Sequence, residues 1–222
     1  MELNQYIDHT LLKAEATLAQ VEKLCQEARD NKFASVCVNS YYVKRAAAFL
    51  QGSGVKVCTV VGFPLGASTM ETKRFEAMKA IADGASEIDM VMNISASKSG
   101  DWQYVLDDMS SLAQVCHAQG KILKVILETA LLTEEEKRKA CELAVKAQVD
   151  FVKTSTGFST AGATEADVKL MRLIVGKDMG VKASGGIRDT ATAKKMIEAG
   201  ATRLGTSASV EIVHGGSGTS SY

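Results

Sequence analysis

The sequence is poor in proline, in net charge and in long apolar runs. It has one proline in 222 residues, and 26 Lys and Arg balance 26 Asp and Glu, so no overall field would attract nucleic acid or an anionic membrane. The first ten residues, MELNQYIDHT, lack the basic segment and apolar run of a signal peptide. No apolar run approaches the ~18 residues that span a bilayer. We therefore expect a cytoplasmic protein that binds neither nucleic acid nor a membrane.

The spacings typical of metal and redox sites are also missing. The five cysteines are odd in number and include no C-x-x-C pair, which favours reduced, buried thiols over disulfides or metal ligation. His9, His117 and His214 lie far apart and show no ligand spacing such as H-E-x-x-H. We therefore expect no metal and no cofactor.

Short β-branched runs alternate with longer segments of helical period. The candidate strands are YIDHT, SVCVN, VKVCTVV, EIDMVM, ILKVILET, DFVKTS, GVKASG and TRLGTS. Between them, segments such as LAQVEKLCQEARD and KRFEAMKAIAD carry apolar residues three and four positions apart. Thr133 with Glu136 and Thr164 with Asp167 have the spacing of helix capping boxes. Glycines occur where three helices should stop: Gly84, Gly120 and Gly200.

This alternation predicts parallel βαβ units, at ~28 residues per unit. Such units form either an open doubly wound sheet or a closed (β/α)8 barrel. No G-x-G-x-x-G follows the first strand, which weakens the dinucleotide-binding form of the open sheet. The count of eight favours an α/β fold of the (β/α)8 (TIM) barrel type, as a single domain over residues 1–214. The tail 215–222, GGSGTSSY, has the composition of a flexible linker.

A short internal repeat in the sequence supports the barrel. Three junctions between a helix and a strand read GASEID, QVDFVK and GATRLG, and their sixth positions are Asp89, Lys153 and Gly205. Each of the three follows an apolar residue, so strand alternation should give them a related orientation. Active sites of parallel barrels lie at the C-terminal ends of the strands. We therefore expect these positions to face the site.

Lysines in two neighbouring strands point to a chemical role. A single strand lysine such as Lys153 in FVKTSTG is usually exposed or paired with a carboxylate for structural reasons. GVKASGG places Lys182 in the next strand, and neighbouring parallel strands lie about 4.8 Å apart. Burial and a like charge both oppose protonation of an amine, and a neutral amine can attack a carbonyl. The pair therefore predicts Schiff-base catalysis with Lys153 as nucleophile, and Asp89 could transfer protons while pairing with Lys182.

Two small-residue loops suggest a phosphate site. The last two predicted strands end in SGGIRD and LGTSAS, which expose backbone N–H groups and precede a short helix. Loops in these positions form the common phosphate site of (β/α)8 barrels. A lone Gly-Gly is usually only a turn, so the second loop strengthens the prediction.

FVKTSTG, EIDMVMN, VKASGG and the terminal SSY resemble the deoxyribose-phosphate aldolase family over essentially the whole chain. The resemblance implies a class I aldolase on a (β/α)8 barrel. Its partners would be a sugar phosphate, 2-deoxy-D-ribose 5-phosphate, and the products D-glyceraldehyde 3-phosphate and acetaldehyde, with no metal. By the same resemblance, Lys153 would form the Schiff base with acetaldehyde, and Lys182 and Asp89 would form the proton relay.

The resemblance also implies binding residues. The phosphate would be held by five small residues: Gly157, Gly185, Gly186, Gly205 and Ser207. Asp8 and Thr10 would contact sugar hydroxyls, although both could equally be a loop residue and a cap. Cys37 would line the pocket, the simpler alternative being core packing.

Two positions qualify this assignment. Some family members carry a phosphate-binding lysine just after STG, where this chain has Phe158. Phosphate affinity is therefore expected to rest more on backbone donors. Tyr222 could fold over the site and assist a proton transfer, or belong to a disordered tail.

Two other functions stay open on the sequence alone. One is a sugar-phosphate isomerase in which Asp89 and a lysine do acid–base work without a covalent intermediate. The other is a barrel that binds a sugar phosphate as a sensor. Whether copies of the chain form a homo-oligomer is also open, because a sequence does not separate exposed apolar faces from buried ones.

Overall fold

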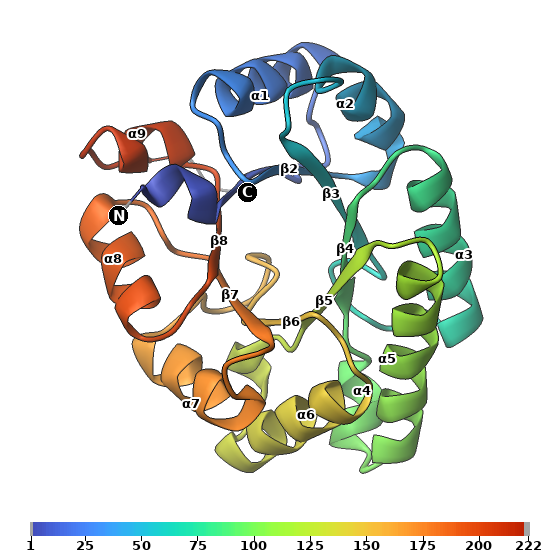
Figure 1. The fold of residues 1–222 in the computed structure, drawn as a ribbon. Helices are drawn as coiled ribbons and strands as arrows, with labels where there is room; N and C mark the ends of the chain where they lie inside the picture. Colours follow the sequence, from blue (N-terminus) through green and yellow to red (C-terminus); the bar gives the residue numbers. More distant parts are fainter. Residues whose placement is uncertain (1, 220–222) are drawn as a thin grey trace.

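Eight short strands close into a parallel barrel in the computed structural model, which describes residues 2–219 (Figure 1). Each strand pairs with the next one in sequence, and β8 pairs with β1. The strands are β1 (Ile7–Leu11), β2 (Ser35–Val38), β3 (Lys56–Val61), β4 (Glu87–Val91), β5 (Ile122–Ile126), β6 (Phe151–Lys153), β7 (Gly180–Ser184) and β8 (Arg203–Thr206). All eight predicted strands and the (β/α)8 fold are confirmed.

Helices surround the barrel and connect its strands (Figure 1). They are α1 (Leu18–Asp30), α2 (Val43–Phe49), α3 (Met70–Ala82), α4 (Ile94–Lys98), α5 (Trp102–His117), α6 (Glu134–Lys146), α7 (Glu165–Val175), α8 (Thr190–Glu198) and α9 (Ser209–Val213). Three short 3-10 segments are η1 (Leu3–Tyr6), η2 (Ser40–Tyr42) and η3 (Thr129–Leu131). The segment LAQVEKLCQEARD coincides with α1.

The predicted helix ends carry the expected local contacts. Thr133 and Glu136 form a complete capping box at the start of α6. Thr164 accepts the N–H of Asp167 at the start of α7, but the Asp167 carboxylate binds Lys137 at 2.6 Å. Gly84, Gly120 and Gly200 follow α3, α5 and α8 and all have positive φ, so the predicted stops are confirmed.

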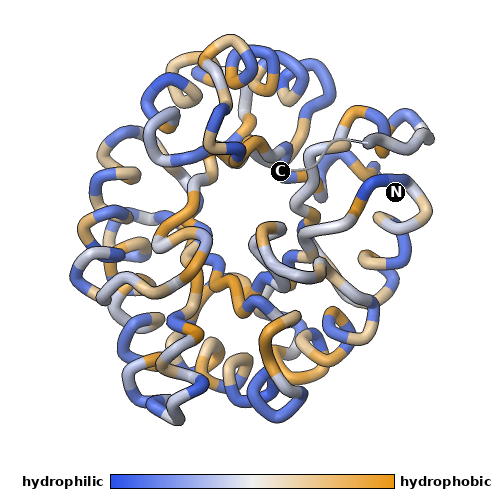
Figure 2. The backbone as a smooth tube through the Cα atoms, turned by 180° about the vertical axis from the view of Figure 1, so that it is seen from behind, coloured by the Kyte–Doolittle hydropathy of each residue, from blue (hydrophilic) through white to orange (hydrophobic). Residues whose placement is uncertain are grey.

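The apolar core lies between the strands and the inner faces of the helices. Figure 2 shows apolar residues along the strands and hydrophilic stretches on the outer turns of the helices. The inside of the barrel differs, because several of its buried side chains are charged, among them Asp8, Asp89, Lys124 and Lys182. Charged groups are rarely buried unless they are paired, so this interior marks the place to look for a site.

The C-terminal segment passes over the outer side of the loop after β7. Ser217 forms an isolated bridge with Asp189, and the Gly218 N–H donates to the Arg188 carbonyl oxygen at 2.8 Å. The flexible tail over 215–222 stays a prediction. Within residues 2–219, no helix combines the length and apolar character needed to cross a bilayer.

Candidate active site

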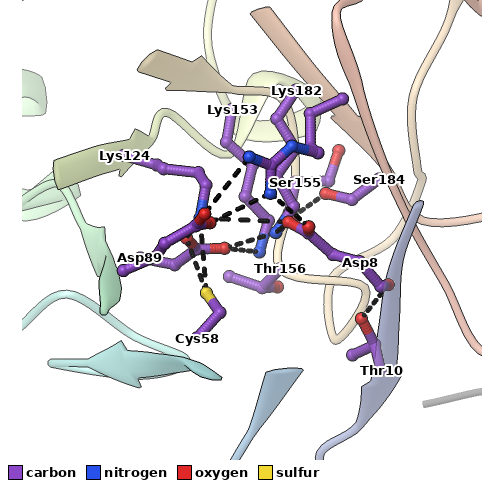
Figure 3. Close-up of polar contacts among 12 residues, drawn as sticks. Asp8, Thr10, Cys58, Asp89, Lys124, Lys153, Ser155, Thr156, Lys182 and Ser184 are labelled. Carbon is purple, nitrogen blue, oxygen red and sulfur yellow. Dashed lines mark hydrogen bonds and ion pairs between the residues drawn. The ribbon is translucent and has the colours of Figure 1, made fainter. Parts of the chain in front are cut away.

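Lys153 and Lys182 lie side by side inside the barrel. They are register partners on β6 and β7, and both are buried. The carboxylate of Asp89, from β4, lies between their amines: its Oδ2 is 2.9 Å from Lys153 Nζ and 2.7 Å from Lys182 Nζ (Figure 3). The structure therefore brings together the three residues proposed for catalysis, with one carboxylate oxygen shared by two lysines.

Three further charged residues join this group, and sequence reasoning missed all of them. Lys124 Nζ lies 2.9 Å from Asp89 Oδ1 and 2.5 Å from Glu87 Oε2 (Figure 3 shows Lys124 and Asp89). Arg203 Nη1 donates to Glu87 Oε2 at 3.0 Å and to Asp8 Oδ1 at 2.6 Å. Lys124, Glu87 and Arg203 therefore connect Asp89 to Asp8 around the inside of the barrel.

Strand alternation was the signal that could have found them. Glu87 precedes Asp89 by two residues and Arg203 precedes Gly205 by two, so each shares a strand face with a residue already selected. Lys124 is the register partner of Asp89 on the neighbouring strand. A sequence-based search two residues back along each selected strand would have included Glu87 and Arg203.

Asp8 belongs to the same group. Its Oδ2 lies 2.5 Å from Lys182 Nζ, and its Oδ1 accepts from Ser35 Oγ at 2.6 Å. Thr10, two residues further along β1, donates its hydroxyl to the backbone carbonyl of Asp8 at 2.8 Å (Figure 3). The Asp8 carboxylate thus forms a second ion pair with Lys182, beside the one from Asp89. Contacts of Asp8 and Thr10 with sugar hydroxyls stay a prediction.

We call these seven residues the charge cluster. Its members are Asp8, Glu87, Asp89, Lys124, Lys153, Lys182 and Arg203. With every group ionised, the charge cluster has four cations and three carboxylates. The cluster carries a surplus of one positive charge in a place that excludes most water.

Mutual attraction in the charge cluster outweighs the cost of burial. Burial alone would raise the pKa of Asp89, but the positive charges of Lys124, Lys153 and Lys182 hold that pKa well below its ordinary value. Burial alone would lower the pKa of Lys182, but Asp8 and Asp89 raise it. A proton in the cluster therefore resides on an amine and not on Asp89.

The loops selected for phosphate binding lie at the C-terminal ends of β6, β7 and β8. Gly157, Gly185 and Gly186 have φ values of 87°, 84° and 79°. An added Cβ at Gly185, in the loop after β7, would lie 2.9 Å from the Cα of Gly162, in the loop after β6. These two loops therefore approach each other too closely for a side chain at Gly185. Gly205 is in β8 and Ser207 follows that strand directly, before α9. Phosphate binding by these residues stays a prediction.

Cys37 is fully buried in a small group with Leu12, Cys58 and Val60. It is the register partner of Cys58, whose hydrogen bond lowers the pKa of Cys37. The ligating atoms of Cys37, Cys58 and Asp89 lie within 4.8 Å of one another. Asp89 is already bound by three lysines, so a metal ion would have to displace an ammonium group, and this donor set does not favour a resident metal.

An aromatic pair borders the mouth of the barrel. The rings of Phe63 and Phe158 meet edge to face at 5.2 Å, and Phe158 is 47% exposed. Phe158 therefore presents an apolar ring where some family members place a phosphate-binding lysine. Tyr222 lies outside the described residues.

Comparison with known proteins agrees along the whole chain. A family profile described as DeoC/LacD family aldolase matches residues 3–219. The chain is 61% identical over 221 residues to the deoxyribose-phosphate aldolase of Brevibacillus brevis, covering 100% of this chain and 99% of that protein. It is 60% identical over 217 residues to the enzyme of the same name from a Geobacillus species, covering 97% and 96%. The solved tetrameric deoxyribose phosphate aldolase of Aeropyrum pernix has a TM-score of 0.90 at 34% identity, over 96% of this chain and 89% of that one. The chain belongs to the DeoC/LacD family of aldolases.

Proposed function

We propose that this protein is a class I aldolase that cleaves 2-deoxy-D-ribose 5-phosphate to D-glyceraldehyde 3-phosphate and acetaldehyde, and catalyses the reverse addition. Relatives at about 60% identity carry the corresponding name. The observation that carries the proposal is the position of Lys153 Nζ in a cluster with four cations and three carboxylates.

The charge cluster makes Lys153 the best candidate for the neutral amine. Lys124 and Lys182 each lie within 4 Å of more than one carboxylate, whereas the ion pair of Lys153 is to Asp89 alone, through an oxygen it shares with Lys182. Loss of one proton would leave the cluster with balanced charge. Lys153 makes the fewest ion pairs among the three lysines of the cluster, and a neutral amine is what carbonyl attack requires.

The proposed reaction begins at Lys153. Lys153 Nζ attacks the C1 aldehyde of the open-chain sugar, and loss of water from the carbinolamine gives a protonated imine. Removal of the C3 hydroxyl proton breaks the C2–C3 bond, releases glyceraldehyde 3-phosphate, and leaves an enamine on Lys153. Protonation of the enamine carbon and hydrolysis release acetaldehyde.

Lys182 and Asp89 have complementary parts in these proton transfers. Because the pKa of Lys182 is raised and that of Asp89 is lowered, Lys182 holds the proton and Asp89 orients it. The Lys182 ammonium can donate to the departing oxygen of the carbinolamine. The glycine loops after β6, β7 and β8 would hold the phosphate by backbone N–H groups.

The test is reductive trapping. The protein is incubated with acetaldehyde and borohydride, digested, and analysed by mass spectrometry, and we expect one ethyl group on Lys153. Turnover of the sugar phosphate without an adduct would favour an isomerase-like acid–base mechanism. Tight binding of the sugar phosphate without turnover would favour a sensor.

The assembly and location of the protein are part of the proposal. We propose that copies of the chain form a homo-oligomer through the surface around Tyr41 and Phe75, which are 84% and 72% exposed and border one hollow of about 860 Å³. Light scattering after size exclusion should give more than the monomer mass, and Phe75→Glu should reduce it; a monomeric wild type contradicts this. The five free, buried cysteines support a reducing compartment such as the cytoplasm.

A further inference from the structure

Glu128 has an unusual backbone for a buried glutamate. It lies just beyond β5 with φ 56° and ψ 63°, in the left-handed region, and is 2% exposed. The other non-glycine residues with positive φ in the described part of the chain are Lys32 and Gln148, both exposed and both just after a helix. A left-handed conformation costs a non-glycine residue about 1–3 kcal/mol and persists where the surroundings hold it. Glu128 is therefore held in place by its contacts.

Within residues 2–219, no Lys or Arg nitrogen forms an ion pair with the Glu128 carboxylate. The other buried carboxylates within residues 2–219 each lie within 4 Å of a Lys or Arg nitrogen: Asp8, Glu87, Asp89, Asp108 and Asp167. Glu128 instead accepts the backbone N–H of Thr156, at 3.2 Å to Oε2 and 3.4 Å to Oε1, and a short hydrogen bond from the Thr156 hydroxyl. Burial raises the pKa of Glu128 in spite of these bonds and of the nearby charge of Lys153. A buried carboxylate without an ion pair is costly, so packing of the core alone does not account for Glu128.

Backbone hydrogen bonds hold the chain around Glu128 against the segment that begins at Lys153. Ile126 is the register partner of Lys153 at the end of β5, and Glu128 follows two residues later. The N–H of Leu127 donates to the Lys153 carbonyl at 2.9 Å, and the N–H of Thr129 donates to the Thr154 carbonyl at 2.9 Å. These two bonds fix the backbone on both sides of Glu128 against the segment that follows the lysine.

The contact with Thr156 controls a turn at the mouth of the barrel. The Thr156 hydroxyl donates to Glu128 and accepts the N–H of Phe158 at 3.0 Å, so the two bonds bracket Gly157. A Cβ added at Gly185 would meet the Gly157 Cα at 3.6 Å, which places this turn against the loop after β7. The turn Thr156–Gly157–Phe158 therefore joins two of the loops proposed to hold the phosphate.

We propose that Glu128 is a positioning residue that fixes the Thr156–Gly157–Phe158 turn in the shape that receives the phosphate group of the substrate. The inference rests on the proposed function, because the ligand of the turn is the phosphate of the sugar. Glu128 acts through Thr156 and does not take part in the chemistry at Lys153. It therefore determines how strongly a phosphorylated sugar is preferred over the same sugar without phosphate.

Three variants and a control test this role by steady-state kinetics with 2-deoxy-D-ribose 5-phosphate and with 2-deoxy-D-ribose. Glu128→Gly removes the carboxylate and also relieves the left-handed backbone, and thermal unfolding of each variant separates a loss of folding from a loss of phosphate binding. Glu128→Ala removes the carboxylate alone, and Glu128→Gln keeps an acceptor oxygen for Thr156. Gln148→Gly is the matched control, because it relieves an exposed left-handed residue that lies before β6, at the opposite end of that strand from the Thr156–Gly157–Phe158 turn.

Loss of two or three hydrogen bonds in the turn should raise KM for the phosphorylated sugar about tenfold or more in Glu128→Gly and Glu128→Ala. We expect kcat/KM for 2-deoxy-D-ribose and the yield of the trapped acetaldehyde adduct to stay within about threefold of wild type, since the hydrogen bonds of the Glu128 carboxylate go to Thr156 and not to Lys153. Glu128→Gln should restore KM to within about threefold, and Gln148→Gly should change neither substrate.

Two results overturn the inference while leaving the aldolase intact. One is an unchanged KM for the phosphorylated sugar in Glu128→Gly. The other is a fall in kcat for both sugars that is as large in Glu128→Gln as in Glu128→Ala, which indicates proton transfer by Glu128. A wild-type protein that neither traps acetaldehyde nor turns over the sugar phosphate overturns the proposed function itself, and is recognised before any variant is made.

Discussion

Two regions of this molecule bury ionisable side chains, and the pKa values of their lysines and aspartates shift in opposite directions. Lys73 of α3 and Asp108 of α5 form an isolated pair, with Lys73 Nζ 2.5 Å from Asp108 Oδ2 and 2.9 Å from the Val91 carbonyl oxygen. The charge cluster inside the barrel holds seven groups at similar distances. Lys73 and Lys182 are both fully buried, so burial alone does not separate the two regions.

The pKa directions differ between the regions. Burial lowers the pKa of Lys73 and raises the pKa of Asp108. The attraction between these two charges is too weak to reverse the effect of burial on either group. In the charge cluster, several opposite charges overcome burial, so the pKa of Lys182 is raised and that of Asp89 is lowered. In an isolated buried ion pair, the attraction between the two charges barely offsets the cost of removing them from water. A network of alternating charges offsets that cost more fully and can still hold one excess cation for chemistry.

The largest expected effect is the loss of activity in Lys153→Leu. Removal of the nucleophile should lower kcat at least about 1,000-fold and abolish the trapped adduct. The remaining three cations and three carboxylates balance, so the melting temperature should fall little. Kinetics and thermal unfolding check both statements, and Lys73→Met is the control, with normal kcat per folded molecule and reduced stability. Turnover that survives Lys153→Leu contradicts the covalent mechanism.

Asp89→Asn should have the next largest effect. It leaves four cations with two carboxylates and removes the group that orients Lys182, so kcat should fall about 100- to 10,000-fold, the range of a lost acid–base contribution. Unlike Lys153→Leu, this variant should also be less stable, because the surplus of buried positive charge grows. A kcat within about tenfold of wild type would remove Asp89 from the proposed relay.

In the isolated pair, the effect should be on stability alone. Asp108→Ala leaves a buried ammonium without its partner and should lower the free energy of unfolding by about 3–5 kcal/mol, with kcat unchanged. The double variant Lys73→Met/Asp108→Leu should recover most of the loss, because an apolar pair of similar volume has no desolvation cost. Urea denaturation measures both. A double variant no more stable than Asp108→Ala would show that the pair is a net source of stability.

The smallest effect is a difference in acid titration. The pKa of Asp89 is depressed in the folded protein, so its contribution to stability is present above the unfolded value of about 3.9 and is lost only as pH falls through the lower, folded value. The pKa of Asp108 is raised, so its contribution is most favourable below about pH 3.9 and is lost as pH rises through the folded value. Carbon NMR of the two carboxyl groups should show Asp108 titrating first as acid is added. The reverse order contradicts the comparison.

Local patterns were enough to predict the elements of the fold and three residues of the charge cluster. Each strand shows β-branched or apolar residues over a few positions, and Thr133 with Glu136 caps α6 by contacts three residues apart. Lys153 and Lys182 could be paired because consecutive strands of a barrel are neighbours. All of these depend on short-range geometry, which a sequence carries in its spacing.

Partners far apart in the chain could not be read in this way. Strand alternation gives Glu87 and Arg203 a face in common with residues already selected, but it does not say which charges they meet. Arg203 meets Asp8 across 195 positions only because β8 closes onto β1. Glu128 was missed for the same reason, since its carboxylate is explained by a threonine 28 residues later.

The sequence by itself determined eight strands, their order and the identity of two neighbouring lysines, because alternation and helix caps are local properties of the chain. Only the tertiary structure decided which charges meet. Closure of the barrel brings side chains from six strands into one buried interior, where each ionisation depends on all the others.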